Sequence, residues 1–207
     1  MTVTRNDRVL TGIDARQFFQ EAVQSAITNQ DVCASTETVC YVVNLLIRFV
    51  HADALFDTTE DGPLIKPLAL MYADAVEAPT PGDRDTSLRR LGDIALFISG
   101  LFSHSLGRSL VDVDYYITMG GNAYGFLADS TRTSREASAL KIAFLELADQ
   151  FAEFVDVLTE VGEHSHLNNS SNIMRLYEIW QATGSRRAAE SLRRHGIYPV
   201  TTIKSTH

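Results

Sequence analysis

The stretch Cys40-Tyr-Val-Val-Asn-Leu-Leu-Ile-Arg-Phe-Val50 does most to decide the expected fold. Nine of its eleven residues are apolar, so they cover almost the whole circumference of a helix. A helix that is hydrophobic on nearly all sides belongs at the centre of a bundle. The β-branched residues would also suit a buried strand, but the length of the run favours a helix. Ser35 or Thr36 can cap it, which predicts a helix from Glu37 to about His51.

Apolar residues recur with helical spacing on both sides of this stretch. The spacing predicts helices over residues 14–28, 64–77, 85–102, 112–129 and 132–163, and two shorter ones over 172–182 and 185–194. No alternating pattern of useful length indicates strands. The predicted fold is therefore an all-α, single-domain bundle of about seven or eight helices, ending in a C-terminal helical hairpin.

The composition of the 207 residues excludes several classes of protein. With 45% hydrophobic and 21% charged residues, the chain does not have the composition of a disordered protein. The longest runs without a charge hold fourteen residues, whereas a membrane-spanning helix needs roughly 20. The N-terminus lacks the apolar core of a signal peptide. We therefore expect a soluble, cytoplasmic protein that does not bind a membrane.

The two cysteines, Cys33 and Cys40, are expected to be reduced. Their spacing along a helix places them roughly 10 Å apart, which is too far for a disulfide. Cys40 lies within the apolar stretch and is predicted to be a small buried hydrophobe. Neither cysteine belongs to a CxxC pair, so they do not predict a zinc site.

The net charge of −8 is unevenly distributed along the chain. Residues 1–167 contain 12 Lys and Arg against 24 Asp and Glu, a net charge of −12. Residues 168–207 contain 6 against 2, a net charge of +4. The division predicts an acidic helical bundle over 1–167 and a basic hairpin with a tail over 168–207, packed on the same domain.

A polar cluster in the middle of the chain suggests a ligand pocket. Asp93 interrupts an apolar run, and a buried Asp93 would need Arg89 or Arg90 as its partner. Such a pair would line a pocket with polar and aromatic residues nearby: His104, Tyr116, Asn122 and Tyr124. The helical wheel places Asp93 away from the main apolar face, which favours a solvated or purely structural carboxylate.

Three glycines lie within one predicted helix: Gly120, Gly121 and Gly125. Each costs a helix up to about 1 kcal/mol relative to alanine, so a compensating role is expected. Glycine at a GxxxG spacing lets another helix or a flat ligand approach closely. Close packing of helices, within the bundle or between two copies, is the favoured interpretation.

The C-terminal hairpin suggests a second kind of site. A helix, a turn at Gly184 and a second helix fit the outline of a helix-turn-helix. Four arginines of the second helix could contact nucleic acid or an acidic partner: Arg186, Arg187, Arg193 and Arg194. The acidic body would repel DNA, so nucleic acid is not the favoured partner.

No common catalytic motif is present, and the pair His164 and His166 does not match the spacing of metal ligands on a helix. We therefore expect no metal and no cofactor, and an enzyme is the less favoured class. The sequence predicts a non-catalytic helical interaction or regulatory protein that self-associates or binds a protein partner. The alternatives are a DNA-binding regulator that uses the hairpin, and a helical protein that binds a ligand or cofactor near Arg89, Asp93 and Tyr116.

Overall fold

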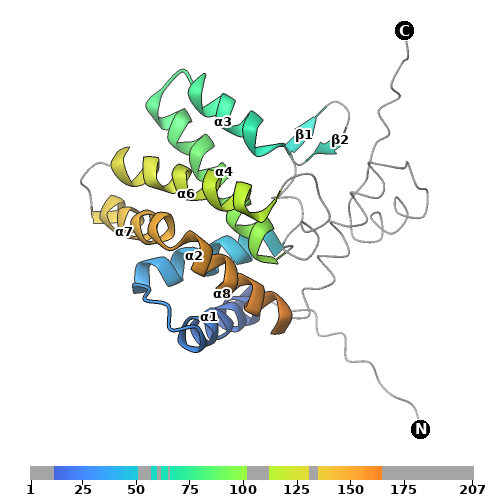
Figure 1. Ribbon diagram of the computed structural model, residues 1–207, viewed down its shortest axis with the longest axis vertical. Helices are drawn as coiled ribbons and strands as arrows, with labels where there is room; N and C mark the ends of the chain where they lie inside the picture. Colours follow the sequence, from blue (N-terminus) through green and yellow to red (C-terminus); the bar gives the residue numbers. More distant parts are fainter. Residues whose placement is uncertain are drawn as a thin grey trace, which may run out of the picture.

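The computed structural model describes residues 12–50, 57–59, 62–64, 66–101, 112–130 and 135–164 (Figure 1). Within these ranges the chain forms seven helices and one short hairpin of two strands. In chain order the elements are α1 (Gly12–Asn29), α2 (Thr36–Val50), β1 (Asp57–Thr59), β2 (Gly62–Leu64), α3 (Leu68–Val76), α4 (Pro81–Leu101), α6 (Val113–Ser130), α7 (Arg135–Asp149) and α8 (Phe151–His164). The prediction of an all-α bundle is confirmed.

The hairpin was not expected, because residues 57–63 lie between two predicted helices and show no alternating pattern of a strand. β1 and β2 pair antiparallel, with Thr58 opposite Pro63. Strands of three residues are too short to show the period-two alternation by which a strand is recognised in a sequence. They leave the helical architecture of the described ranges unchanged.

The centre of the bundle is α4, which packs against α3, α6 and α8. Every residue from Leu91 to Gly100 is buried. The predicted central helix, α2, packs against α1 and α7 and keeps one narrow face open to solvent. Cys40 and Arg48 lie on that face and are exposed, so the prediction of a buried Cys40 is wrong.

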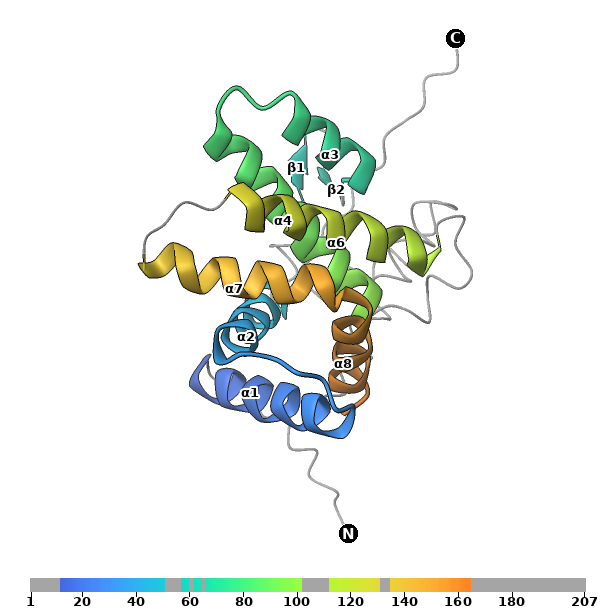
Figure 2. The ribbon, with the colours of Figure 1, turned by 60° about the vertical axis from the view of Figure 1, so that its left-hand side comes forward.

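The single long helix predicted over 132–163 is two helices. α7 ends at Asp149 and α8 begins at Phe151, and Figure 2 shows α8 turned away from the direction of α7. Hydrogen bonds continue through the turn, from the Gln150 amide to the Glu146 carbonyl and from the Phe154 amide to the Gln150 carbonyl. No Gly or Pro marks the bend, so packing explains it: α7 contacts α2 and α6, whereas α8 contacts α4 and α1.

Hydrogen bonds at the start of α2 fix it against α7. Ser35 caps the helix as predicted, because its Oγ accepts a 3.2 Å hydrogen bond from the Thr38 amide. The Ser35 amide and hydroxyl both donate to a carboxylate oxygen of Glu146, at 2.8 and 3.0 Å. These hydrogen bonds tie α7 to the start of α2.

Among the described residues, no helix is long and apolar enough to cross a membrane. The predicted C-terminal hairpin, with Arg186, Arg187, Arg193 and Arg194, lies outside the described residues, and so does His104.

Candidate functional site

Asp93 of α4 is completely buried and fully hydrogen-bonded. Its Oδ1 accepts a 2.6 Å hydrogen bond from the Tyr41 hydroxyl of α2 and a 2.8 Å one from the Tyr124 hydroxyl of α6. Its Oδ2 accepts from the guanidinium of Arg48, which also forms an ion pair with it. A solvated Asp93 is therefore excluded, because α2 and α6 cover the face of α4 that a wheel of α4 alone leaves open.

The position of Tyr124 depends on Gly92, the residue before Asp93. A Cβ atom at position 92 would lie 2.9 Å from Cε1 of Tyr124, closer than such atoms approach in real proteins. Glycine therefore lets the tyrosine ring lie against the α4 backbone. The ring of Phe144 stacks on Tyr124 at 5.7 Å and meets Tyr41 edge-on at 5.4 Å, which fixes both phenols.

Both phenols stay protonated over the physiological range. Burial raises the pKa of Tyr41 far above its ordinary value of 10.0, and the charge of Asp93 raises it further. The same two causes raise the pKa of Tyr124. Each hydroxyl is therefore a hydrogen-bond donor to the carboxylate and does not act as a base at neutral pH.

Arg89 of α4 lies next to this cluster without pairing with Asp93. Its Nε donates a 3.2 Å hydrogen bond to the Tyr41 oxygen, and its guanidinium lies 5.1 Å from the centre of the Tyr41 ring. Among the described residues it forms no ion pair within 4 Å. Asp85, one turn earlier, contacts Arg84 and Ser130 instead.

The charge of Arg89 is retained although the side chain is half-buried. Burial lowers the pKa of Arg89, but the neighbouring Tyr41 and Asp93 outweigh burial, so the pKa is raised overall. Arg48 and Arg89 thus lie beside one carboxylate, and Arg48 is the arginine that pairs with it. The positive charge of Arg89 is therefore not neutralised by an ion pair among the described residues.

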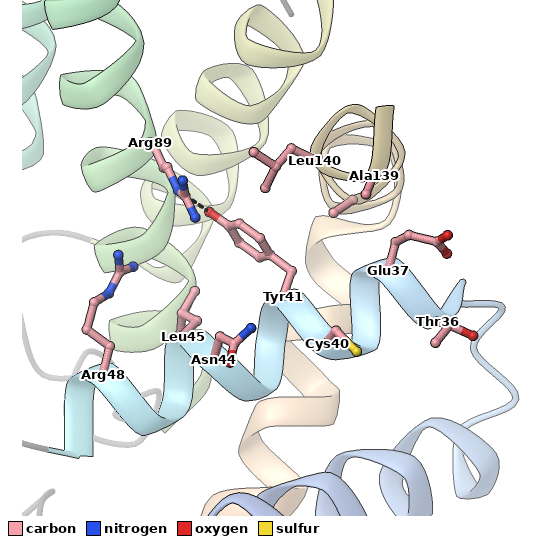
Figure 3. A pocket seen from close by; sticks show the side chains of 11 residues that line it. Thr36, Glu37, Cys40, Tyr41, Asn44, Leu45, Arg48, Arg89, Ala139 and Leu140 are labelled. Carbon is pink, nitrogen blue, oxygen red and sulfur yellow. Dashed lines mark hydrogen bonds between the residues drawn. The ribbon is translucent and has the colours of Figure 1, made fainter. Parts of the chain in front are cut away.

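Arg48 and Arg89 border a cleft of about 470 Å³ between α2 and α7 (Figure 3). The exposed face of α2 forms one wall, and apolar residues of α7, such as Leu140, form the other. Figure 3 shows the two arginines at one end and Glu37 at the other. The lining residues are Thr36, Glu37, Cys40, Tyr41, Asn44, Leu45, Arg48, Arg89, Ala139, Leu140 and Ala143. Such a cleft can bind an elongated ligand with one anionic end.

The structure brings only part of the predicted pocket together. Arg89, Asp93 and Tyr124 belong to the cluster described above. Tyr116 is half-buried on α6 and meets the ring of Tyr115 at 5.8 Å. Asn122 is exposed and lines a different cavity, between α6 and the junction of α7 and α8.

Sequence reasoning missed the contribution of α2 to the site. Tyr41 and Arg48 are 52 and 45 residues from Asp93, so no local pattern connects them. A signal was nevertheless present. Tyr41, Asn44 and Arg48 carry the polar side-chain atoms of the otherwise apolar stretch from Cys40 to Val50, and their spacing of three and four residues places them on one face.

The three glycines of α6 have different surroundings. A Cβ at Gly120 would lie 2.3 Å from Cζ of Phe151 and 2.9 Å from Cβ of Ala95, so α6 approaches both α8 and α4 closely there. Gly121 and Gly125 have no neighbour closer than 3.6 Å to an added Cβ, and both line the same cavity as Asn122.

Among the described residues, no group of three or more His, Cys, Asp or Glu is placed to hold a metal ion. No family model matches the chain, and no curated protein or solved structure matches it either.

Proposed function

We propose that this chain is a non-catalytic, regulatory helical protein whose α2/α7 cleft binds a small organic anion. The observation that carries the proposal is that Arg89 lies beside a carboxylate with which Arg48 already pairs. Asp93 is occupied by Arg48 and by two tyrosine hydroxyls, which leaves the Arg89 guanidinium beside the cleft without an acid of its own among the described residues.

A guanidinium in this position favours a carboxylate or phosphate as its partner. Its planar fork of donors matches two oxygen atoms at once. Of the donors of Arg89, Nε contacts Tyr41 and thereby orients the group. Partial burial strengthens the attraction relative to open solvent.

The shape and the remaining lining define the rest of the ligand. A volume of about 470 Å³ lies within the range of roughly 300–1,000 Å³ that is usual for small-molecule sites. Ala139 and Leu140 offer a partly exposed apolar surface to the body of a ligand. Because Glu37 lies at the far end, the other end of the ligand should be neutral or positively charged.

Binding rather than catalysis is proposed because the titratable cluster around Asp93 is not available to a ligand. Asp93 has no exposed surface, and both tyrosines that contact it hold their protons. Among the residues that the structure describes, the lining of the cleft includes neither histidine nor lysine. The groups that face the cleft therefore suit recognition better than proton transfer.

Native mass spectrometry of the full chain, purified without denaturation, tests the proposal. An organic acid should be retained by the wild type, lost by Arg89→Gln and retained by Arg16→Gln, which removes an exposed arginine of α1. If no acid is retained, thermal shift measurements with benzoate and with its neutral analogue benzamide test whether the cleft binds an anion. Stabilisation by benzoate alone supports the proposal, and equal effects of the two probes contradict it.

A further inference from the structure

A second surface feature lies away from the cleft, where the end of α3, the start of α4 and the end of α6 meet (Figure 1). Three large apolar side chains are exposed there: Tyr72 at 43%, Val76 at 67% and Phe126 at 56%. They line a groove of about 320 Å³ whose floor includes Leu88. Apolar side chains gathered in one groove mark an interaction surface more often than scattered ones do.

The charges at the rim of this groove are balanced. Arg84 at the start of α4 and Asp129 at the end of α6 both line it, and they carry opposite charges. A strongly basic or acidic partner would find no matching excess of charge here. Among the described residues, the ion pair of Arg84 is with its neighbour Asp85, at 3.8 Å and with both side chains exposed, so breaking it costs little free energy.

We infer that this groove is the interface of a symmetric homodimer. In a two-fold dimer the same patch meets itself, so a contact from residue i to residue j occurs twice. A patch with one cation, one anion and an apolar centre is complementary to its own copy. Arg84 of each subunit would face Asp129 of the other, with Phe126 and Val76 buried between them. The balanced rim also lets two copies of a chain with net charge −8 meet without juxtaposing like charges.

Sedimentation equilibrium of the full chain over a range of concentrations tests the inference. The wild type should dimerise, and Phe126→Asp or Val76→Asp should weaken dimerisation at least about tenfold, because each places an unpaired charge in the apolar centre. Leu145→Asp is the matched control, since Leu145 of α7 is 49% exposed and does not line the groove. It should leave the dimer intact.

A charge exchange distinguishes this two-fold contact from any other association. Arg84→Glu and Asp129→Arg should each weaken the dimer, and the double variant should restore it, because the opposite charges again face each other. Circular dichroism confirms that each variant is folded. A wild type that stays monomeric, or a dimer that survives both Phe126→Asp and Val76→Asp, overturns the inference.

Discussion

The hydroxyl of Tyr41 donates a 2.6 Å hydrogen bond to Oδ1 of Asp93, which lies 52 residues further along the chain. The same tyrosine oxygen accepts a hydrogen bond from Arg89. Tyr41 therefore separates Arg89 from the carboxylate and leaves the positive charge of the guanidinium at the edge of the α2/α7 cleft. The proposed anion site depends on this relationship.

The buried carboxylate should be important for stability. Asp93→Ala removes the acceptor of two buried hydroxyls and the partner of Arg48, so the free energy of unfolding should fall by about 3–5 kcal/mol. Asp93→Asn keeps the shape and one acceptor oxygen, and should lower it by about 1–3 kcal/mol. Urea denaturation measures both.

The matched control for these variants is Asp74→Asn. Asp74 of α3 also pairs with a cation, Lys66, but its side chain is 51% exposed. Loss of an exposed ion pair changes stability by at most about 1 kcal/mol. If Asp93→Ala costs no more than Asp74→Asn, the cluster does not stabilise the fold.

The glycines of α6 should respond in opposite directions to alanine. Gly120→Ala places a methyl group against Phe151, so it should destabilise the fold by about 1–3 kcal/mol despite the better helix propensity of alanine. Gly125→Ala meets only Cβ of Ala148, at 3.9 Å, and should stabilise by up to about 1 kcal/mol. Thermal denaturation of the two variants side by side checks the expected difference of sign.

Stability should fall steeply at alkaline pH. The pKa values of Tyr41 and Tyr124 are raised on folding, so above the ordinary value of 10.0 the unfolded chain releases protons that the folded chain retains. The stabilisation by these tyrosines is therefore complete below pH 10 and is lost as the pH rises beyond it. The loss should approach about 1.4 kcal/mol per pH unit for each tyrosine.

Urea unfolding of the wild type and of Tyr41→Phe at increasing pH measures this slope. In the variant the slope should be shallower by the contribution of one tyrosine, about 1.4 kcal/mol per pH unit. Ultraviolet titration of the folded wild type gives an independent readout. At least two of the seven tyrosines should ionise only when the chain unfolds. Complete ionisation of a folded chain would show that the two phenols are not buried against Asp93.

The sequence predicts the helices of this protein better than it predicts the site. Apolar residues with helical spacing reveal which regions are helical, and Ser35 reveals where α2 begins. The turn at Gln150 has no local signal, because hydrogen bonding continues through it. It arises from the packing of α7 and α8 on different neighbours.

The partners of Asp93 are hidden for the same reason. A wheel of α4 describes only α4, whereas the burial of Asp93 is decided by the way α2 and α6 cover it. Arg89 lies one turn from Asp93 and is the partner that local spacing suggests. The ion pair is formed instead by Arg48 from a distant helix, because α2 brings its polar face to that point.

The most direct test of the anion site uses Cys40, which lines the cleft, with the exposed Cys33 outside it as an internal control. The rates of modification by dithiobis(nitrobenzoate), an aromatic carboxylate, and by neutral dithiodipyridine are measured for each cysteine. We predict that the ratio of the Cys40 rate to the Cys33 rate is about fivefold higher for the anionic reagent, since one close charge contributes on the order of 1 kcal/mol. The preference should disappear in Arg89→Gln and persist in Arg16→Gln. The same ratio for both reagents in the wild type would contradict the account.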